Sequence, residues 1–282
     1  MTTSGDARTQ GPSGDARLPG SQRRARDTGP EARAGRRRVW LLVALVVLMV
    51  LGVALAPPIP QDPAYHDYAD RRAAAGVPNV LNVASNLPFL LVGALGLRFL
   101  HRDRRHGGAA AFVTPGERQP YWVFFAGIAL TGIGSAYYHW WPDNTTLLWD
   151  RLPMTIAFMA LLASVLGERI SRRAGAWGLW PLLIVGAAST LYWHVGEQRG
   201  HGDLRPYALV QFGSMVLIPL ILALFPARYT RTTDLVAAIG WYALAKVFEH
   251  FDRAIFSLIA VSGHTWKHLA SAAGACWILR ML

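Results

Sequence analysis

Five polar residues in three apolar parts of the sequence carry side chains that can build a metal site. They are Ser135, His139, Asp150, His264 and His268. The first two residues and the last two are each spaced four apart, so each pair shares one face of a helix. Three histidines around an open fourth position form a common catalytic zinc site. An interfacial polar pair also explains the histidine spacing, close helix packing explains a serine beside glycines, and a helix N-terminal charge explains Asp150.

The composition places these residues in a membrane protein. Hydrophobic residues make up 52% of the 282 residues and charged residues only 16%. Several apolar runs of about 20 residues predict an all-α membrane protein, which excludes a soluble enzyme, a DNA-binding domain and a fibrous protein. The single cysteine, Cys276, excludes an intramolecular disulfide and a metal site with several cysteines. A metal would therefore need histidine and carboxylate ligands.

Eight apolar segments have the length of membrane-spanning helices. The prolines after residue 56 stop the first segment, Pro206 suits the first turn of the sixth, and Thr233 with Asp234 can cap the seventh. The predicted spans are 39–56, 80–100, 120–139, 147–166, 177–195, 206–225, 234–259 and 264–282.

The first span has a second interpretation as a signal peptide. Ala54-Leu55-Ala56 resembles a cleavage site, but the 18-residue apolar core of 39–56 is long for one. Pro57 directly after the site is also unfavourable for cleavage. We therefore expect an uncleaved N-terminal anchor.

The basic residues predict the direction of the spans. Residues 1–38 hold nine arginines among Gly, Ser, Pro and Ala, which predicts a disordered cytoplasmic tail that can also touch anionic lipid. Of the 28 Lys and Arg, 20 fall in the predicted inner segments and 5 in the outer loops. This bias places both termini inside, and it argues against nucleic acid as the reason for the net charge of +11.

This topology brings the five polar residues to one depth. His139 ends an outward helix, Asp150 begins the next inward helix, and His264 begins the last inward helix. Ser135 and His268 lie one turn deeper, about 6 Å at 1.5 Å per residue. The sequence therefore predicts a site near the outer face of the membrane.

Other polar residues near this depth have supporting roles by their spacing. Lys246, Glu249 and Arg253 share one helix face and predict an internal chain of ion pairs. Asp252 is expected to accept a hydrogen bond from a site histidine, and Asn82 and Asn86 are expected to form hydrogen bonds between helices. His194 and Glu197 are expected to form a pocket rim or an interfacial pair. The other histidines fall in loops and carry no signal: His66, His101, His106 and His201.

At these positions the chain resembles the alkaline ceramidase family, part of the CREST group of membrane hydrolases and receptors. The resemblance rests on Ser135-x3-His139, on Asp150 and on His264-x3-His268, and residues 82–89 resemble the first core helix of that family. It covers residues 60–282 and implies a seven-transmembrane-helix bundle as the catalytic domain, 57–282, with 39–56 as an extra N-terminal helix. It also implies zinc on the three histidines, with Asp150 and Ser135 beside the metal-bound water.

The resemblance further raises the question of calcium. Eukaryotic members of the family bind calcium in the acidic segment before the first core helix, where this chain has Asp67 and Asp70. Other acidic ligands are missing here, and Asn79 occupies one expected position. Calcium on Asp67 and Asp70 is therefore a weaker expectation than zinc on the histidines.

The resemblance implies hydrolysis of a lipid amide, as in ceramide, to a fatty acid and an amine. Zinc would activate the attacking water, Asp150 would be the general base and Ser135 an oxyanion donor. The lipid would enter from the bilayer. A zinc-stabilised lipid-sensing receptor without turnover and a related ester hydrolase remain alternatives. The Arg- and Ala-rich composition is typical of a GC-rich bacterium, which favours the bacterial plasma membrane.

Overall fold

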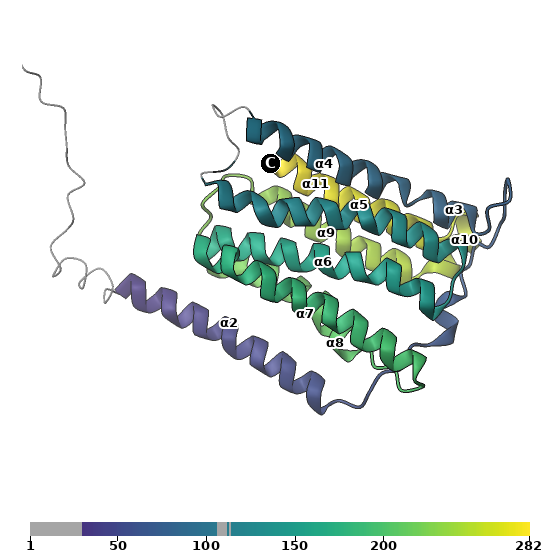
Figure 1. Cartoon of the computed structure of the whole chain (residues 1–282), viewed down its shortest axis with the longest axis horizontal. Coiled ribbons are helices and arrows are strands. Elements are labelled where there is room, and N and C mark those ends of the chain that lie inside the picture. The colour runs from purple at the N-terminus through teal and green to yellow at the C-terminus, as the bar shows by residue number, and fades with distance from the viewer. Residues whose placement is uncertain (1–29, 106–111, 113) are drawn as a thin grey trace, which may run out of the picture. The chain divides into compact units, whose positions relative to one another are not determined.

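The computed structural model describes residues 30–105, 112 and 114–282, and these residues are mostly helical (Figure 1). By contacts the chain divides into two compact units, residues 1–41 and 42–282. The site described below lies wholly in the second unit. The helices are α2 (Pro30–Leu55), η1 (Pro63–His66), α3 (Val80–Ala84), α4 (Leu87–Arg105), η2 (Pro115–Arg118), α5 (Gln119–Trp140), α6 (Asn144–Arg169), α7 (Arg172–Gln198), α8 (Arg205–Leu224), α9 (Thr232–His250), α10 (Asp252–Ile259) and α11 (Gly263–Met281).

The helices confirm an all-α membrane protein. Five stretches of the described residues are long and apolar enough to cross a membrane, and they correspond to α2, to α3 with α4, and to α6, α7 and α8. The other long helices, α5, α9 and α11, pack against neighbouring helices of the bundle. Helix α9 contains Lys246 and Glu249, and helix α11 contains His264, Lys267 and His268, and these polar residues lower the hydropathy of both helices.

Three predicted helix ends can be compared with the structure. Helix α2 begins at Pro30, so residues 30–38 are helical where the sequence suggested disorder, while the rest of that tail lies outside the described residues. Pro206 lies in the first turn of α8, as predicted. Thr233 and Asp234 do not cap α9, because the helix begins at Thr232 and Arg231 is its N-cap residue.

Two of the predicted spans are each broken into two helices. The break between α3 and α4 follows from Pro88, which has no N–H to donate to the carbonyl of Ala84, and the Asn86 side chain donates to the carbonyl of Asn82 at 2.7 Å. The break between α9 and α10 falls at Phe251. Both breaks leave short helices, α3 and α10, beside the start of α11.

Glycines allow α5 to pack closely against two neighbours. A Cβ atom at Gly134 would lie 1.9 Å from the Trp149 carbonyl oxygen of α6, and one at Gly132 would lie 2.9 Å from the Leu90 nitrogen of α4. No larger residue fits either position without moving a backbone. This packing brings Ser135, which follows Gly134, against the first turns of α6.

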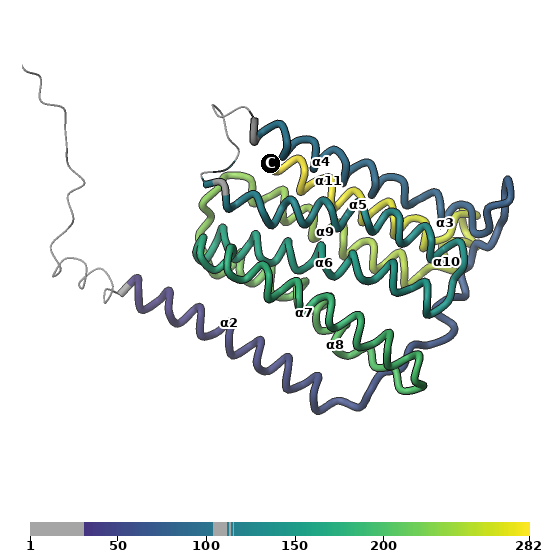
Figure 2. Tube along the Cα trace, in the orientation of Figure 1, coloured from purple at the N-terminus to yellow at the C-terminus, as the bar shows by residue number. Residues whose placement is uncertain are grey.

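Consecutive long helices run in opposite directions, as the trace in Figure 2 shows. The end of α5 and the beginnings of α6 and α11 therefore lie at one end of the bundle, which we call the site end. Away from it, buried apolar residues such as Phe125, Leu179 and Ile218 fill the space between the helices. Many large apolar side chains, including Trp177 and Ile184, face outward, as expected for helices in lipid.

Candidate active site

The three predicted histidines meet at the site end of the bundle. The Nε2 atom of His139 lies 3.2 Å from Nε2 of His268 and 3.3 Å from Nε2 of His264. One ligand nitrogen from each ring lies within 4.8 Å of the other two, and all three side chains are buried. The spacing within α11 and the crossing of α5 together produce this convergence.

The donor set fits a metal ion. Neutral imidazole has one N–H and one acceptor nitrogen, so three converging Nε2 atoms cannot all be satisfied by hydrogen bonds to one another. Zinc–nitrogen bonds of about 2.0–2.1 Å in tetrahedral geometry place neighbouring nitrogens about 3.3–3.4 Å apart, close to the distances between these rings. The three histidines can therefore hold a metal ion with their Nε2 atoms as ligands.

A hydrogen bond fixes the orientation of one ring. Nδ1 of His268 lies 2.7 Å from the Ser85 hydroxyl, which donates to the Asn82 carbonyl at 3.1 Å. Since the Ser85 proton is used on that carbonyl, Nδ1 of His268 donates, which leaves Nε2 as the lone-pair nitrogen for a metal. Such a partner behind a ligand is usual in metal sites. Ser85 was not predicted as a site residue, because its partner His268 lies 183 residues away in the sequence.

Aromatic packing holds the other two rings. The buried Tyr68 ring lies 4.9 Å from the ring of His139 and 4.8 Å from that of His264. The Tyr138 hydroxyl lies 2.9 Å from Nδ1 of His66, whose Nε2 lies 2.9 Å from the Asn144 side-chain oxygen. His66 thus joins the loop before α3 to α5 and α6. Neither Tyr68 nor His66 had a signal in the sequence.

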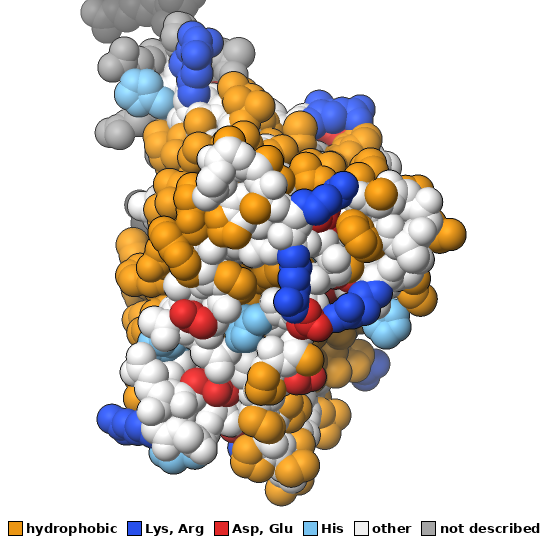
Figure 3. All heavy atoms as spheres, turned by 90° about the vertical axis from the view of Figure 1, so that its right-hand side faces the viewer, with side chains coloured by type: hydrophobic (Ala, Val, Ile, Leu, Met, Phe, Trp, Pro, Cys, Tyr) orange, Lys and Arg blue, Asp and Glu red, His pale blue; other side chains and the backbone are white. Residues whose placement is uncertain are grey.

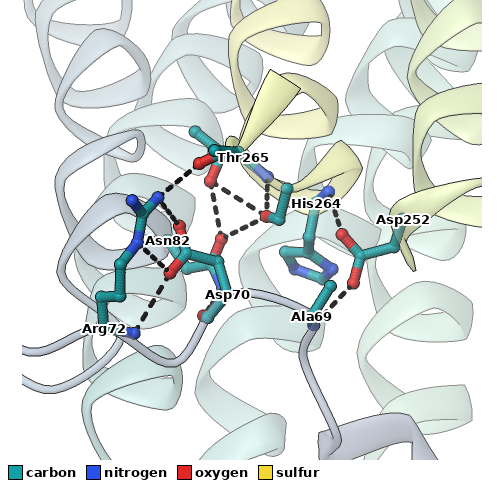
Figure 4. A network of polar contacts seen from close by, with 9 residues as sticks. Ala69, Asp70, Arg72, Asn82, Asp252, His264 and Thr265 are labelled. Carbon is teal, nitrogen blue, oxygen red and sulfur yellow. Dashed lines mark hydrogen bonds and ion pairs between the residues drawn. The ribbon is translucent and has the colours of Figure 1, made fainter. Parts of the chain in front are cut away.

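The first turn of α11 is tied to two other segments (Figure 4). Asp252 accepts from the His264 backbone N–H at 2.8 Å and from the Ala69 N–H at 3.0 Å. It therefore acts on the backbone of a site histidine, not on an imidazole ring as the sequence suggested. The Asn82 side chain accepts from the Thr265 hydroxyl at 2.8 Å, which is the predicted hydrogen bond between helices.

The two aspartates of the proposed calcium segment are already paired with arginines. Asp70 binds Arg72 through two hydrogen bonds, of 2.9 and 2.6 Å, and Asp67 pairs with both Arg71 and Arg253. The Arg72 guanidinium holds the pKa of the Asp70 carboxyl below its usual value. In the described part of the chain, the histidines are the one group of three or more such ligands that converges. Asp67 and Asp70 do not fit a calcium site in this arrangement.

Asp150 and Ser135 lie together beside the histidines. Both are buried, and their side chains lie close to one another. Together with His268 they line a cavity of about 290 Å³. The close crossing at Gly134 explains this pairing, because it presses the end of α5 against the first turns of α6.

The cavity is polar at the site end and apolar along the rest of its length. Beyond the polar residues its walls are apolar side chains such as Phe124, Met154, Phe158 and Leu161. It follows α11 from His268 to Ile278, about 15 Å at 1.5 Å per residue. That is half of the roughly 30 Å hydrocarbon core of a bilayer. A chain of lipid length can lie in it with its head at the polar end.

The predicted chain of ion pairs forms with a different third member. Lys246 binds Glu249, and Lys267 of α11 donates to Glu249 at 3.2 Å. Arg253 turns away to Asp67, because the break at Phe251 rotates α10 relative to α9. Both lysines and Glu249 line the cavity at its polar end.

His194 and Glu197 of α7, which the sequence suggested as a pocket rim or an interfacial pair, do not line the cavity. Glu197 accepts from the Gln61 N–H at 2.9 Å and from the Trp193 indole at 3.2 Å, so it supports the loop before η1. His194 pairs with Gln198 on its own helix at 2.9 Å.

Figure 3, which looks onto the site end, shows acidic, basic and histidine side chains gathered in the middle of this face.

Comparison with known proteins gives one family. The model of the family described as Ceramidase matches residues 66–281, which is most of the chain and includes the three histidines, Asp150 and Ser135. No curated protein matches the chain.

Proposed function

Because this chain belongs to the ceramidase family, whose name implies a lipid amide hydrolase, we propose that it is a zinc-dependent amidohydrolase. Its substrate would be ceramide or a related N-acyl lipid, cleaved to a fatty acid and an amine. One observation carries the proposal: three buried imidazoles converge beside Asp150 and Ser135 at the polar end of an apolar cavity.

Each residue of the site has a role in this proposal. His139, His264 and His268 hold the zinc ion, which when bound supplies Lewis-acid activation of a water and of the amide carbonyl. Asp150 takes the proton of the attacking water and passes it to the leaving amine nitrogen. Ser135 donates a hydrogen bond to the developing oxyanion.

The cavity supports a lipid as the substrate. An acyl chain would lie among Phe124, Phe158 and Leu161, and the amide would reach the polar end at Asp150. This binding mode separates the reacting group from the apolar chain, and the bilayer would supply the lipid to the bundle.

We further propose that the site end faces outward from a bacterial plasma membrane, with both termini in the cytoplasm. The distribution of Lys and Arg between the loops supports this orientation. Reporter fusions after Arg105 and after Arg199 test it. They should report cytoplasmic and outer locations respectively, and the reverse pattern would contradict the proposed orientation.

The test of the reaction is product analysis with purified protein. Wild type in detergent is incubated with amide lipids and matched ester lipids, and released fatty acid is measured by mass spectrometry. We expect fatty acid from the amides, none after chelation of the metal, and recovery on adding zinc. Asp150→Asn, which is nearly isosteric, is the control. Release from esters alone would favour the ester hydrolase, and no release from any lipid by folded, zinc-loaded protein would contradict hydrolysis.

A further inference from the structure

Arg151 is a buried cation beside the reacting groups that the proposed reaction does not use. It follows Asp150 in the second turn of α6, has 5% of its surface exposed and lines the same cavity. A charged side chain inside a membrane protein is costly, so it is expected to have a function or a partner of opposite charge.

The guanidinium is held by aromatic rings and one amide. It lies 4.3 Å from the centre of the Trp193 ring and 4.7 Å from that of Tyr207. Its Nη2 atom donates to the Gln61 side-chain oxygen at 2.7 Å. Nη1 is buried and has no hydrogen-bond partner among the described residues. The Nη1 donor of Arg151 therefore makes no hydrogen bond with the described residues, although the position of the side chain is fixed.

The residues around Arg151 are themselves fixed. Glu197 binds the backbone N–H of Gln61 and the indole N–H of Trp193, so one carboxylate orients both supports of the guanidinium. Tyr65 adds a third ring, 5.3 Å from the guanidinium carbon. The unused Nη1 donor thus belongs to a side chain that its neighbours hold in place and that is not free to turn elsewhere.

The charges at the polar end of the cavity leave a positive excess. Arg151, Lys246 and Lys267 line it together with the carboxylates Asp150 and Glu249. Both lysines are paired with Glu249. Arg151 forms no ion pair with a carboxylate of the described residues, and a metal ion on the histidines would add further positive charge. An anionic group of a ligand is the partner that this end of the cavity lacks.

We propose that Arg151 binds an anionic group on the amine half of the substrate, so that the enzyme selects N-acyl lipids with a carboxylate or similar oxyanion in the headgroup, such as N-acyl amino acids. The inference rests on the proposed function, since it assigns the substrate class of that site. The acyl chain would lie in the apolar part of the cavity, the amide beside Asp150, and the anion beside the Arg151 guanidinium, toward Tyr65.

A binding experiment tests this assignment without turnover. The probes are two ketone analogues with a 14-carbon acyl chain, in which a methylene replaces the amide nitrogen and the headgroup ends in a carboxylate or an alcohol. Calorimetry on wild type should show tighter binding of the carboxylate. Arg151→Gln should weaken carboxylate binding about 10- to 100-fold, as expected for losing a charged hydrogen bond, and leave alcohol binding unchanged. Arg151→Lys should be intermediate.

The control is Arg199→Gln, which removes one exposed cation from the loop after α7, outside the cavity. It should bind both analogues as wild type does. Metal content and melting temperature establish that each variant is folded. Equal binding of the two analogues by wild type, or an equal loss of both in a folded Arg151→Gln, would overturn the proposal. Myristate binding that depends on Arg151 while analogue binding does not would also overturn it, because Arg151 would then serve the released acid.

Turnover gives an independent measurement. In wild type kcat/KM should be higher for N-myristoylglycine than for N-myristoylethanolamine, and Arg151→Gln should abolish that preference. If neither amide is cleaved, the hydrolase proposal fails, whereas the calorimetry still decides whether Arg151 binds the anion.

Discussion

Two neighbouring parts of the site end contain potential metal ligands, and they differ in what surrounds those ligands. The three histidines present neutral nitrogen donors to one point, and the hydrogen bond behind His268 leaves its Nε2 available. Asp67 and Asp70 lie in the loop that contacts these rings through Tyr68, but their carboxylates are paired with arginines.

The difference shows that ligand type alone does not identify a metal site. Carboxylates are strong ligands for calcium, yet the guanidinium of Arg72 already neutralises Asp70, and a cation would have to displace it. The histidines have no such competitor. In this protein, arginines pair with the carboxylates of the loop, whereas the Nε2 atoms of the converging imidazoles are available to bind an ion.

The largest effect is expected from removing one imidazole. His264→Ala should lower amide hydrolysis by more than about 10⁴-fold, because both the metal and the activation of water are lost. Released fatty acid measures the effect. Asp67→Asn is the matched control from the other region and should keep its activity. Equal losses in the two variants would remove the distinction between the regions.

The next effect separates the metal from the general base. Asp150→Asn should keep the metal and lose about 10²- to 10⁴-fold in kcat, since the amide side chain cannot accept the proton of water. Metal content and turnover are measured on the same sample. Full activity in this variant would exclude Asp150 as the base.

A smaller loss is expected at Ser135. Ser135→Ala should reduce kcat by about 10- to 10³-fold, because a zinc ion on the three histidines would share the stabilisation of the oxyanion. Ser135→Thr keeps the hydroxyl and is the rescue variant. If the alanine variant is more impaired than Asp150→Asn, the order of roles proposed for these two residues is wrong.

Ser85 tests the support behind the metal. Ser85→Ala removes the partner of His268 Nδ1 and should weaken zinc binding about 10- to 100-fold, as is usual for such partners. Competition with a zinc-binding dye measures the affinity. An unchanged affinity would show that packing alone orients the ring of His268.

The smallest effects are expected in the loop with the arginines. A calcium-specific chelator should leave activity unchanged.

The stability of the loop should depend on pH. Arg72 lowers the pKa of Asp70 in the folded protein, so the pair stabilises the fold above the unfolded carboxyl pKa of about 3.9. This stabilisation is lost as the pH falls through the lower pKa of the folded state.

Asp70→Asn should therefore lower the melting temperature only slightly at neutral pH, since Arg72 is half exposed. Thermal melts of wild type and Asp70→Asn should converge in acid. A difference that persists below the folded-state pKa would mean that Asp70 acts through something other than its charge.

The sequence predicted the parts of the site that depend on regular spacing. His264 and His268 share a helix face because they are four residues apart. Because consecutive helices run in opposite directions, both histidines lie at the end of the bundle where α5 ends. The eight apolar segments likewise predicted the long helices. The breaks at Ser85 and Phe251 were not predicted, although Pro88 is a local signal for the first of them.

The missed residues share a physical reason. Tyr68, Ser85 and Arg151 gain their roles from contacts with parts of the chain far away in sequence, which no local pattern records. The pocket of Arg151, for example, combines Gln61 from a loop with Trp193 from α7. Arg253 was placed wrongly for the same reason, since its partner Asp67 lies 186 residues away.

The central claim is that the histidines, and not the acidic loop, hold the metal of this ceramidase-family protein. Elemental analysis of purified protein, prepared with both zinc and calcium and then freed of unbound ions, tests it most directly. We expect about one zinc per chain and no calcium, with the zinc lost when His139, His264 and His268 are all changed to alanine. Stoichiometric zinc in that folded triple variant, or calcium lost on changing Asp67 and Asp70 to asparagine, would contradict the claim.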